Sequence, residues 1–250
     1  MRYKLLEKNM PLVLFSDVKK IKKKYRRSNN YLKTITGIVT CLLFFSSLPA
    51  FATLLPLNEL IAKAQERYEK TEDLKAQFTQ EVTIKAMNKT DREEGVLYVK
   101  NPRRMLWSYS KPKAKKLIIN PKNAWLYLPD DHAVYIQDTE NIYKSKLAVK
   151  ILSGIGKLSE DFHIGFSRPE PVDRNGNYLL TLTPKIADAG IDKLYLTVDK
   201  DTFQIIQCSF TDLYGNMTRI RLTEIKINNN LDDKLFNFKP PSGVEVFNMP

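Results

Sequence analysis

The chain has 250 residues, enough for one or two domains with a buried core. Lys and Arg number 40 against 28 Asp and Glu, and this formal net charge of +12 would suit nucleic acid or an anionic surface if it were evenly spread. The first 52 residues, however, hold 11 Lys/Arg and 2 Asp/Glu, which leaves 29 against 26 for the remainder. Strong basicity is therefore excluded as a property of the body of the chain, and we expect no nucleic-acid partner.

A basic stretch followed by an apolar run predicts a secretory signal peptide in residues 1–52. The uncharged run at 35–48 has about 14 residues, fewer than the roughly 20 that a membrane-spanning helix requires, although a single anchor is the alternative interpretation. Ala50 and Ala52 then supply small residues at the minus 3 and minus 1 positions of a cleavage site after Ala52. We expect residues 53–250 to be exported to the periplasm as one soluble domain.

Cysteine usage predicts neither a lipid anchor nor a disulfide. Cys41 precedes most of the apolar run, and Thr40 is a poor match for the residue before a lipidated cysteine. The exported chain would keep only Cys208, so an intramolecular disulfide is impossible.

The first element expected after residue 56 is an amphipathic helix of about four turns, because Leu57, Leu60, Ala64 and Tyr68 recur at helical spacing. From Leu74 onward the apolar period changes to two. Turn signals such as Asn-Pro and Lys-Pro separate the alternating segments at roughly ten-residue intervals, which indicates an antiparallel meander. The expected strands are 74–84, 95–100, 104–109, 115–119, 124–128 and 133–137.

A second helix is expected within residues 143–162, where one helical face is apolar. Gly154 and Gly156 fall inside it, each costing about 1 kcal/mol relative to alanine, which favours a short, interrupted or mobile helix. We predict that this segment is a moving lid whose apolar face consists of Leu147, Ile151, Leu152, Ile155 and Leu158.

Strand patterns resume at 178–183, 193–199, 204–211 and 217–227, and no linker or repeat interrupts the body. The expected fold is α+β and mainly β: one large antiparallel sheet with two helices available to cover its concave face.

Catalytic chemistry has little support in the sequence. The two histidines, His132 and His163, have no partner at a metal-ligand spacing, and glycine-rich phosphate loops are absent. Cys208 alternates with apolar neighbours, which favours a buried thiol over a nucleophile. We therefore expect no enzymatic activity, no metal and no cofactor.

Aromatic residues are concentrated on the predicted strands. Met105, Trp107 and Tyr109 share one face of a strand, and Trp125 and Tyr127 share one face of another. Between them, Leu117 and Ile119 share a face of a third strand. Such a set forms either the filled core of a sandwich or barrel, or the wall of an apolar pocket. The lysines and arginines of 100–116 flank this region, either as a charged sheet edge or as an attraction for lipid head groups or an acidic partner.

Several motifs, taken in order, resemble the periplasmic outer-membrane lipoprotein carrier proteins, the LolA family. They are LKAQFTQ at 74–80, GVLYVKNP at 95–102, AWLY at 124–127, LTLTPK at 180–185, Asp212 with Gly215-Asn216, and FNFKPPSGV at 236–244. Each motif is weak alone, but their order and spacing together cover the chain after the predicted signal peptide.

The resemblance implies an unclosed β-barrel whose hydrophobic cavity is capped by helices. It also implies a monomer that takes acylated lipoproteins from an inner-membrane ABC transporter and passes them to an outer-membrane acceptor. The implied cavity residues are Phe78, Leu97, Val99, Met105, Trp107, Tyr109, Leu117, Ile119, Trp125 and Tyr127. Asn101 stands where well-studied members carry an arginine that holds the lid, and Arg103 or Arg104 is a candidate substitute. Alternatives are a carrier of another lipid or glycolipid, or an envelope-stress domain that senses lipoproteins.

Overall fold

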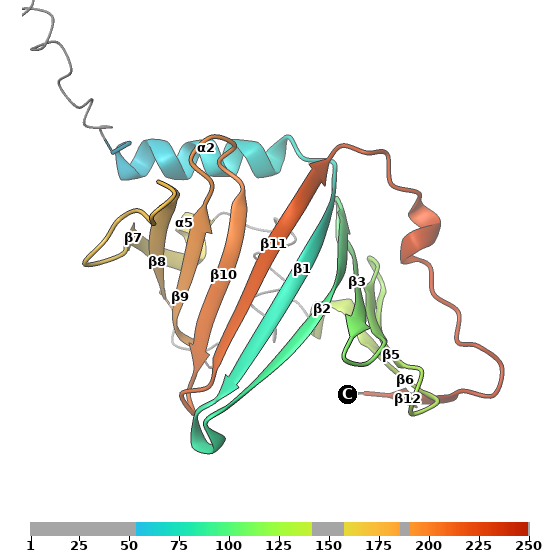
Figure 1. Ribbon diagram of the computed structural model, residues 1–250. Helices are drawn as coiled ribbons and strands as arrows, with labels where there is room; N and C mark the ends of the chain where they lie inside the picture. The colour runs from blue at the N-terminus through green and yellow to red at the C-terminus, as the bar shows by residue number, and fades with distance from the viewer. Residues whose placement is uncertain (1–53, 142–157, 186–190, 250) are drawn as a thin grey trace, which may run out of the picture. The chain divides into compact units, whose positions relative to one another are not determined.

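The computed structural model describes residues 54–141, 158–185 and 191–249, and its main feature is a single sheet of twelve strands (Figure 1). The order across the sheet is β12-β6-β5-β4-β3-β2-β1-β11-β10-β9-β8-β7. The strands are β1 Asp73–Ile84, β2 Lys89–Lys100, β3 Arg104–Lys111, β4 Lys115–Ile119, β5 Asn123–Leu128, β6 Ala133–Asp138, β7 Phe162–Phe166, β8 Tyr178–Pro184, β9 Ile191–Val198, β10 Ile205–Asp212, β11 Met217–Ile227 and β12 Glu245–Asn248.

The pairing of these strands leaves the sheet unclosed. All neighbours are antiparallel except β12, which runs parallel to β6. The strands β12 and β7 stand at the two ends of the order and do not pair with each other, so the predicted unclosed antiparallel sheet is confirmed.

Helix α2, Leu57–Glu69, confirms the helix expected from the apolar spacing. Leu60 and Ala64 are buried on the face that packs against the sheet, and the amide of Leu60 closes the first turn on the carbonyl of Pro56 at 3.0 Å. The Thr71 hydroxyl donates to the Arg67 carbonyl at 2.7 Å, which satisfies one of the free carbonyls at the helix end.

The other helices of the described residues are short. They are the 3₁₀ turns η1 Lys85–Met87 and η2 Asp233–Phe236 and the single turn α5 Leu158–Asp161. Of the predicted lid face, Leu158 is partly buried against the core. Leu147, Ile151, Leu152 and Ile155 lie outside the described residues, so the lid stays a prediction.

The sheet buries apolar side chains on both faces. We call the face that carries the larger cluster, with Phe78, Trp107 and Leu196 among its members, the inner face. The outer face carries a second cluster built from Leu106, Ile118, Trp125, Val134 and Phe236. Side chains alternate along each strand, so consecutive residues of β3, β4 and β5 belong to different cores.

Gly95 allows three strands to approach closely. It lies opposite Phe78 of β1 and Tyr109 of β3, and a Cβ placed there would stand 2.1 Å from the backbone oxygen of Ser108 and 2.8 Å from the Phe78 ring. We expect Gly95→Ala to lower the free energy of unfolding by about 2 to 3 kcal/mol, because backbone atoms would have to move.

The matched control for Gly95→Ala is Gly165→Ala in β7. A Cβ at Gly165 meets nothing within 4 Å, so this change should leave stability unchanged or raise it by about 0.5 kcal/mol. Urea unfolding of both variants checks the prediction, which fails if the two lose equal stability.

Candidate functional site

An aromatic cluster lies on the inner face where β1 and β3 flank β2. The Phe78 ring meets Trp107 edge to face at a centroid distance of 4.8 Å and Tyr109 at 4.9 Å. Trp107 and Tyr109, two residues apart on β3, stack at 6.3 Å, and the Trp107 indole donates to the Met105 sulfur at 2.8 Å. Phe78, Met105 and Trp107 are buried, whereas Tyr109 extends the cluster toward a neighbouring pocket.

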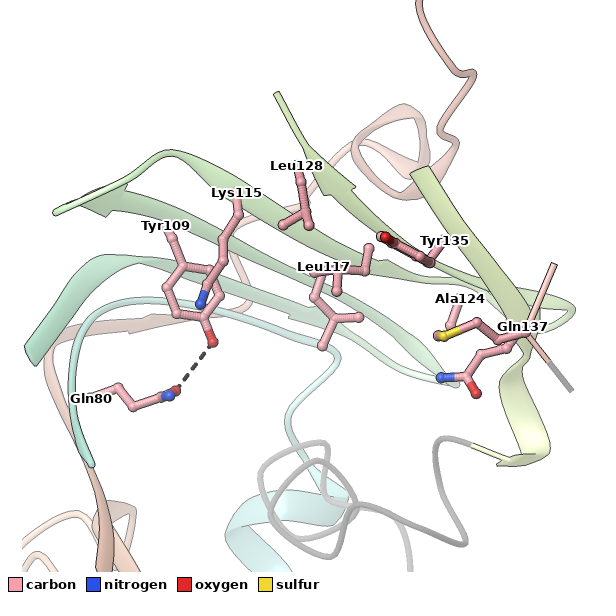
Figure 2. Close-up of a pocket in the computed structure, with 10 residues that line it drawn as sticks. Gln80, Tyr109, Lys115, Leu117, Ala124, Leu128, Tyr135 and Gln137 are labelled. Atoms are coloured by element: carbon pink, nitrogen blue, oxygen red, sulfur yellow. Dashed lines mark hydrogen bonds between the residues drawn. The ribbon is translucent and has the colours of Figure 1, made fainter. Parts of the chain in front are cut away.

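That pocket has a volume of about 310 Å³ and lies on the inner face of β3 to β6. It is lined by Gln80, Tyr109, Lys115, Leu117, Ala124, Leu126, Leu128, Tyr135, Gln137 and Met249. Figure 2 shows Gln80, Tyr109 and Lys115 grouped at one side and Ala124 with Gln137 at the other. Apolar side chains from β4 and β5 therefore lie between two polar margins.

The polar margin beside Tyr109 is a connected network. The Tyr109 hydroxyl donates to Gln80 Oε1 at 3.1 Å, and the Lys115 ammonium lies 4.3 Å from the centre of the Tyr109 ring. Lys115 also pairs with Glu93 at 2.6 Å, and both side chains are about three-quarters buried. Burial raises the pKa of Tyr109 well above its usual value, so the hydroxyl keeps its proton.

The prediction that Trp125 and Tyr127 share this face was wrong. In the β4–β5 pairing, Ile118 lies opposite Trp125 and Leu117 lies opposite Leu126. Since directly opposed residues project to the same side, Trp125 and Tyr127 point to the outer face. There they contact Phe238, at ring distances of 6.3 and 5.4 Å.

The other predicted cavity residues do lie on the inner face, but they differ in exposure. Tyr109 and Leu117 line the pocket. The rest belong to the buried inner cluster beside it: Phe78, Leu97, Val99, Met105, Trp107 and Ile119. Sequence reasoning missed Ala124, Leu126 and Leu128, although their alternation with Trp125 and Tyr127 is visible in β5.

The predicted latch positions each have a partner in the described chain. The Asn101 side-chain amide donates to the Thr71 carbonyl at 2.6 Å, which ties the β2–β3 turn to the end of α2. Arg104 lies 3.7 Å from Asp233 of η2. Arg103 pairs with Glu140, shortly before residues 142–157. Arg103 is thus the candidate whose partner lies nearest in sequence to the predicted lid segment, and its role as a latch stays a prediction.

The chemically reactive residue types are dispersed. Within residues 54–141, 158–185 and 191–249, no group of three His, Cys, Asp or Glu side chains is placed to hold a metal ion. Cys208 is buried among apolar side chains of the inner cluster, and this burial raises the pKa of its thiol to about 12. None of the helices in this described part is long and apolar enough to span a membrane.

The structure is thus an unclosed sheet with a pocket of mixed apolar and polar lining on its inner face. The comparisons identify the family: residues 69–239 match the model of the outer membrane lipoprotein carrier protein LolA, and the chain belongs to this family.

Curated relatives that match the chain carry the name outer-membrane lipoprotein carrier protein, among them the following two. The one from Pseudomonas aeruginosa (strain UCBPP-PA14) is 30% identical over 178 residues, which cover 71% of this chain and 82% of that protein. The one from Bordetella avium (strain 197N) is 28% identical over 205 residues, 80% of this chain and 94% of that protein. Among solved structures, an uncharacterized conserved protein from Thermus thermophilus shares the fold, with a TM-score of 0.50 and 14% identity over 77% of this chain and 98% of that one.

Proposed function

We propose that this chain is a periplasmic carrier that holds the acyl chains of lipoproteins against the inner face and transfers lipoproteins from the inner to the outer membrane. The observation that carries the proposal is the pocket bordered by Leu117, Leu126 and Leu128 in a member of the LolA family. The predicted signal peptide, cleaved after Ala52, supplies the export that this role needs.

A lipoprotein needs a carrier because its acyl chains have a high free energy in water. Each buried methylene contributes about 0.8 kcal/mol, so an acyl chain of about 16 carbons left in water costs on the order of 10 kcal/mol. The pocket volume of about 310 Å³ is near the lower end of the range for small-molecule sites, about 300 to 1,000 Å³. We therefore propose that a full lipoprotein cargo enlarges the pocket by parting the neighbouring aromatic cluster, beginning at Tyr109.

The partners in this proposal are an inner-membrane lipoprotein-releasing ABC transporter, which loads the carrier, and an outer-membrane acceptor, which unloads it. The test uses membrane vesicles that contain the transporter and a triacylated lipoprotein. Addition of ATP and the full chain should move the lipoprotein into the soluble fraction, bound to the carrier. The Pseudomonas aeruginosa relative serves as the positive control. The proposal fails if that relative releases the lipoprotein and this chain does not.

A carrier of another lipid is the second candidate, and the polar margins of the pocket favour it. Gln80, Lys115 and Gln137 offer hydrogen-bond partners that a bare acyl chain does not use but a lipid head group would. Mass spectrometry of molecules that co-purify with the chain separates the candidates: lipoproteins support the first, and a glycolipid or phospholipid supports the second.

A further inference from the structure

Two adjacent hairpin tips carry the most exposed large apolar side chains of the described residues. The tip between β10 and β11 presents Leu213, which is 77% exposed, and Tyr214, which is 86% exposed. The tip between β1 and β2 presents Met87, which is 67% exposed. Both tips lie at the end of the strands opposite α2 (Figure 1).

Hydrogen bonds fix the shape of the first tip and join it to the second. The Asp212 carboxylate accepts bonds of 2.9 Å from the backbone amides of Tyr214 and Asn216 and from the Asn216 side chain. The amide of Lys85, in the neighbouring tip, donates to Asn216 Oδ1 at 3.1 Å. The apolar side chains are therefore displayed by an ordered structure.

The loop Asp173–Asn177 shows that this shape does not require apolar side chains. The Asp173 carboxylate accepts from the backbone amides of Asn175 and Asn177, at 2.8 and 2.9 Å, and from the Asn177 side chain at 3.0 Å. In the positions that correspond to Leu213 and Tyr214, this loop carries Arg174 and Asn175. The backbone shape of the turn therefore does not explain why Leu213 and Tyr214 are apolar.

We propose that Met87, Leu213 and Tyr214 dock this chain on the surface of a phospholipid bilayer that contains anionic head groups. The side chains project from hairpin ends, and a bilayer accepts such projections without a complementary pocket. A tyrosine places its ring among acyl chains and its hydroxyl among head groups. Lys85 and Lys89 flank Met87 in sequence, and cations near a bilayer surface are attracted to anionic lipid.

The tip that carries Met87 continues β1, a strand that contributes one residue to the pocket lining. Gln80, which lines the pocket, precedes Ile84 at the end of β1 by four residues, or about 13 Å of extended strand. Docking through the tips would therefore hold the pocket close to the membrane surface. This inference goes beyond the proposed function, because it concerns the surface that the chain contacts and holds for any cargo.

A local probe tests the docking. In a Cys41→Ser background, Leu213→Cys is labelled with an environment-sensitive nitrobenzoxadiazole dye, and Arg174→Cys is the matched control. Position 174 is equivalent to position 213 within its loop, but it lies at the opposite end of the strands. The loop of Arg174 leads into Tyr178, which pairs with Val198 at the end of β9, whereas the loop of Leu213 follows Asp212, which pairs with Ile191 at the start of β9. Vesicles of phosphatidylcholine and phosphatidylglycerol should raise the emission at position 213 at least twofold and leave position 174 unchanged.

Vesicle flotation of the full chain gives the second readout. The double variant L213S/Y214N should bind the same vesicles on the order of tenfold more weakly, whereas R174S/N175S should bind like the unmodified chain. The N-terminal segment contributes equally to all of these proteins. Equal dye responses at both positions, no response at either, or equal flotation of the two double variants would overturn the inference.

Two further outcomes distinguish docking on lipid from docking on a protein, and from the proposed function. A dye response at position 213 that requires membrane proteins in the vesicles would assign the tips to a protein partner and overturn the lipid assignment. Binding of a fluorescent acyl probe in solution should be equal in L213S/Y214N and the unmodified chain. Failed docking with normal acyl binding overturns this inference alone, and absent acyl binding in the unmodified chain overturns the proposed function instead.

Discussion

Replacing Phe236 by alanine is expected to lower the free energy of unfolding by about 3 to 5 kcal/mol. Phe236 is fully buried in η2, where it fills the outer cluster against Leu106, Ile118 and Val134. Removal of the ring would leave a cavity between the sheet and the C-terminal segment that covers it. Urea unfolding measures the loss.

Polar contacts hold the same C-terminal segment at its start. The buried Asp73 carboxylate accepts from the amides of Asn229 and Leu231 at 2.7 and 3.0 Å. The Lys100 ammonium donates to the Leu231 carbonyl at 2.7 Å and pairs with Asp233 at 2.5 Å, which lowers the pKa of that carboxyl group. These contacts limit relaxation around position 236, so the cavity cannot easily close.

Phe247→Ala is the control for Phe236→Ala. Phe247 lies further along the same segment in β12, is 42% exposed and stacks on Tyr135 at 5.2 Å. Its truncation should cost about 1 kcal/mol or less, because a large part of its surface already faces water in the folded protein. Similar losses for the two variants would contradict the account of the outer cluster.

Leu126→Gln is expected to weaken binding of an acyl probe by about 5- to 150-fold. Leu126 is partly exposed on the pocket wall between Leu117 and Tyr135, so an acyl chain in the pocket would cover the new amide without supplying a hydrogen bond. Covering an unpaired amide costs about 1 to 3 kcal/mol, which converts to that change in affinity. In the free protein the amide reaches water, so the stability should change by only about 1 kcal/mol.

The matched change is Leu179→Gln. Leu179 is also partly exposed but alternates with the inner residues Tyr178 and Leu180, which places it on the outer face of β8. In a titration with a fluorescent fatty-acid probe, Leu179→Gln should bind the probe as tightly as the unmodified chain does, and Leu126→Gln should bind it clearly more weakly. Equal affinities in the two variants would remove the pocket from the binding site.

The sequence predicted the elements whose patterns are periodic. Helix α2 and the strand pairs from β3 to β6 and from β8 to β11 agree with the alternation of apolar residues. Strand β2 begins at Lys89, although its expected start was Gly95. Residues 89–94 are polar, so no alternation marks them, and their pairing with β1 extends the hairpin.

The candidate site was harder to predict because alternation shows which residues share a face but not which face is the inner one. Trp125 and Tyr127 were assigned inward because they are aromatic, whereas the outer face has its own apolar cover in Phe236 and Phe238. The register across the β4–β5 turn pairs Ala124 with the inner residue Ile119, so the alternate residues Trp125 and Tyr127 point outward. Met249, which also lines the pocket, directly follows β12, a short exposed strand without a sequence signal.

The central claim, that acyl chains bind on the inner face, can be measured with the two tryptophans of the chain. Trp107 lies on the inner face and stacks on Tyr109 at the pocket, whereas Trp125 lies on the outer face beneath the C-terminal segment. Trp125→Phe leaves Trp107 as the only indole, and Trp107→Phe leaves Trp125. A spin-labelled fatty acid quenches the fluorescence of indoles that it contacts. It should strongly quench the Trp107 fluorescence of Trp125→Phe and barely change the Trp125 fluorescence of Trp107→Phe. Equal quenching of the two variants, or stronger quenching of Trp107→Phe, would contradict the account.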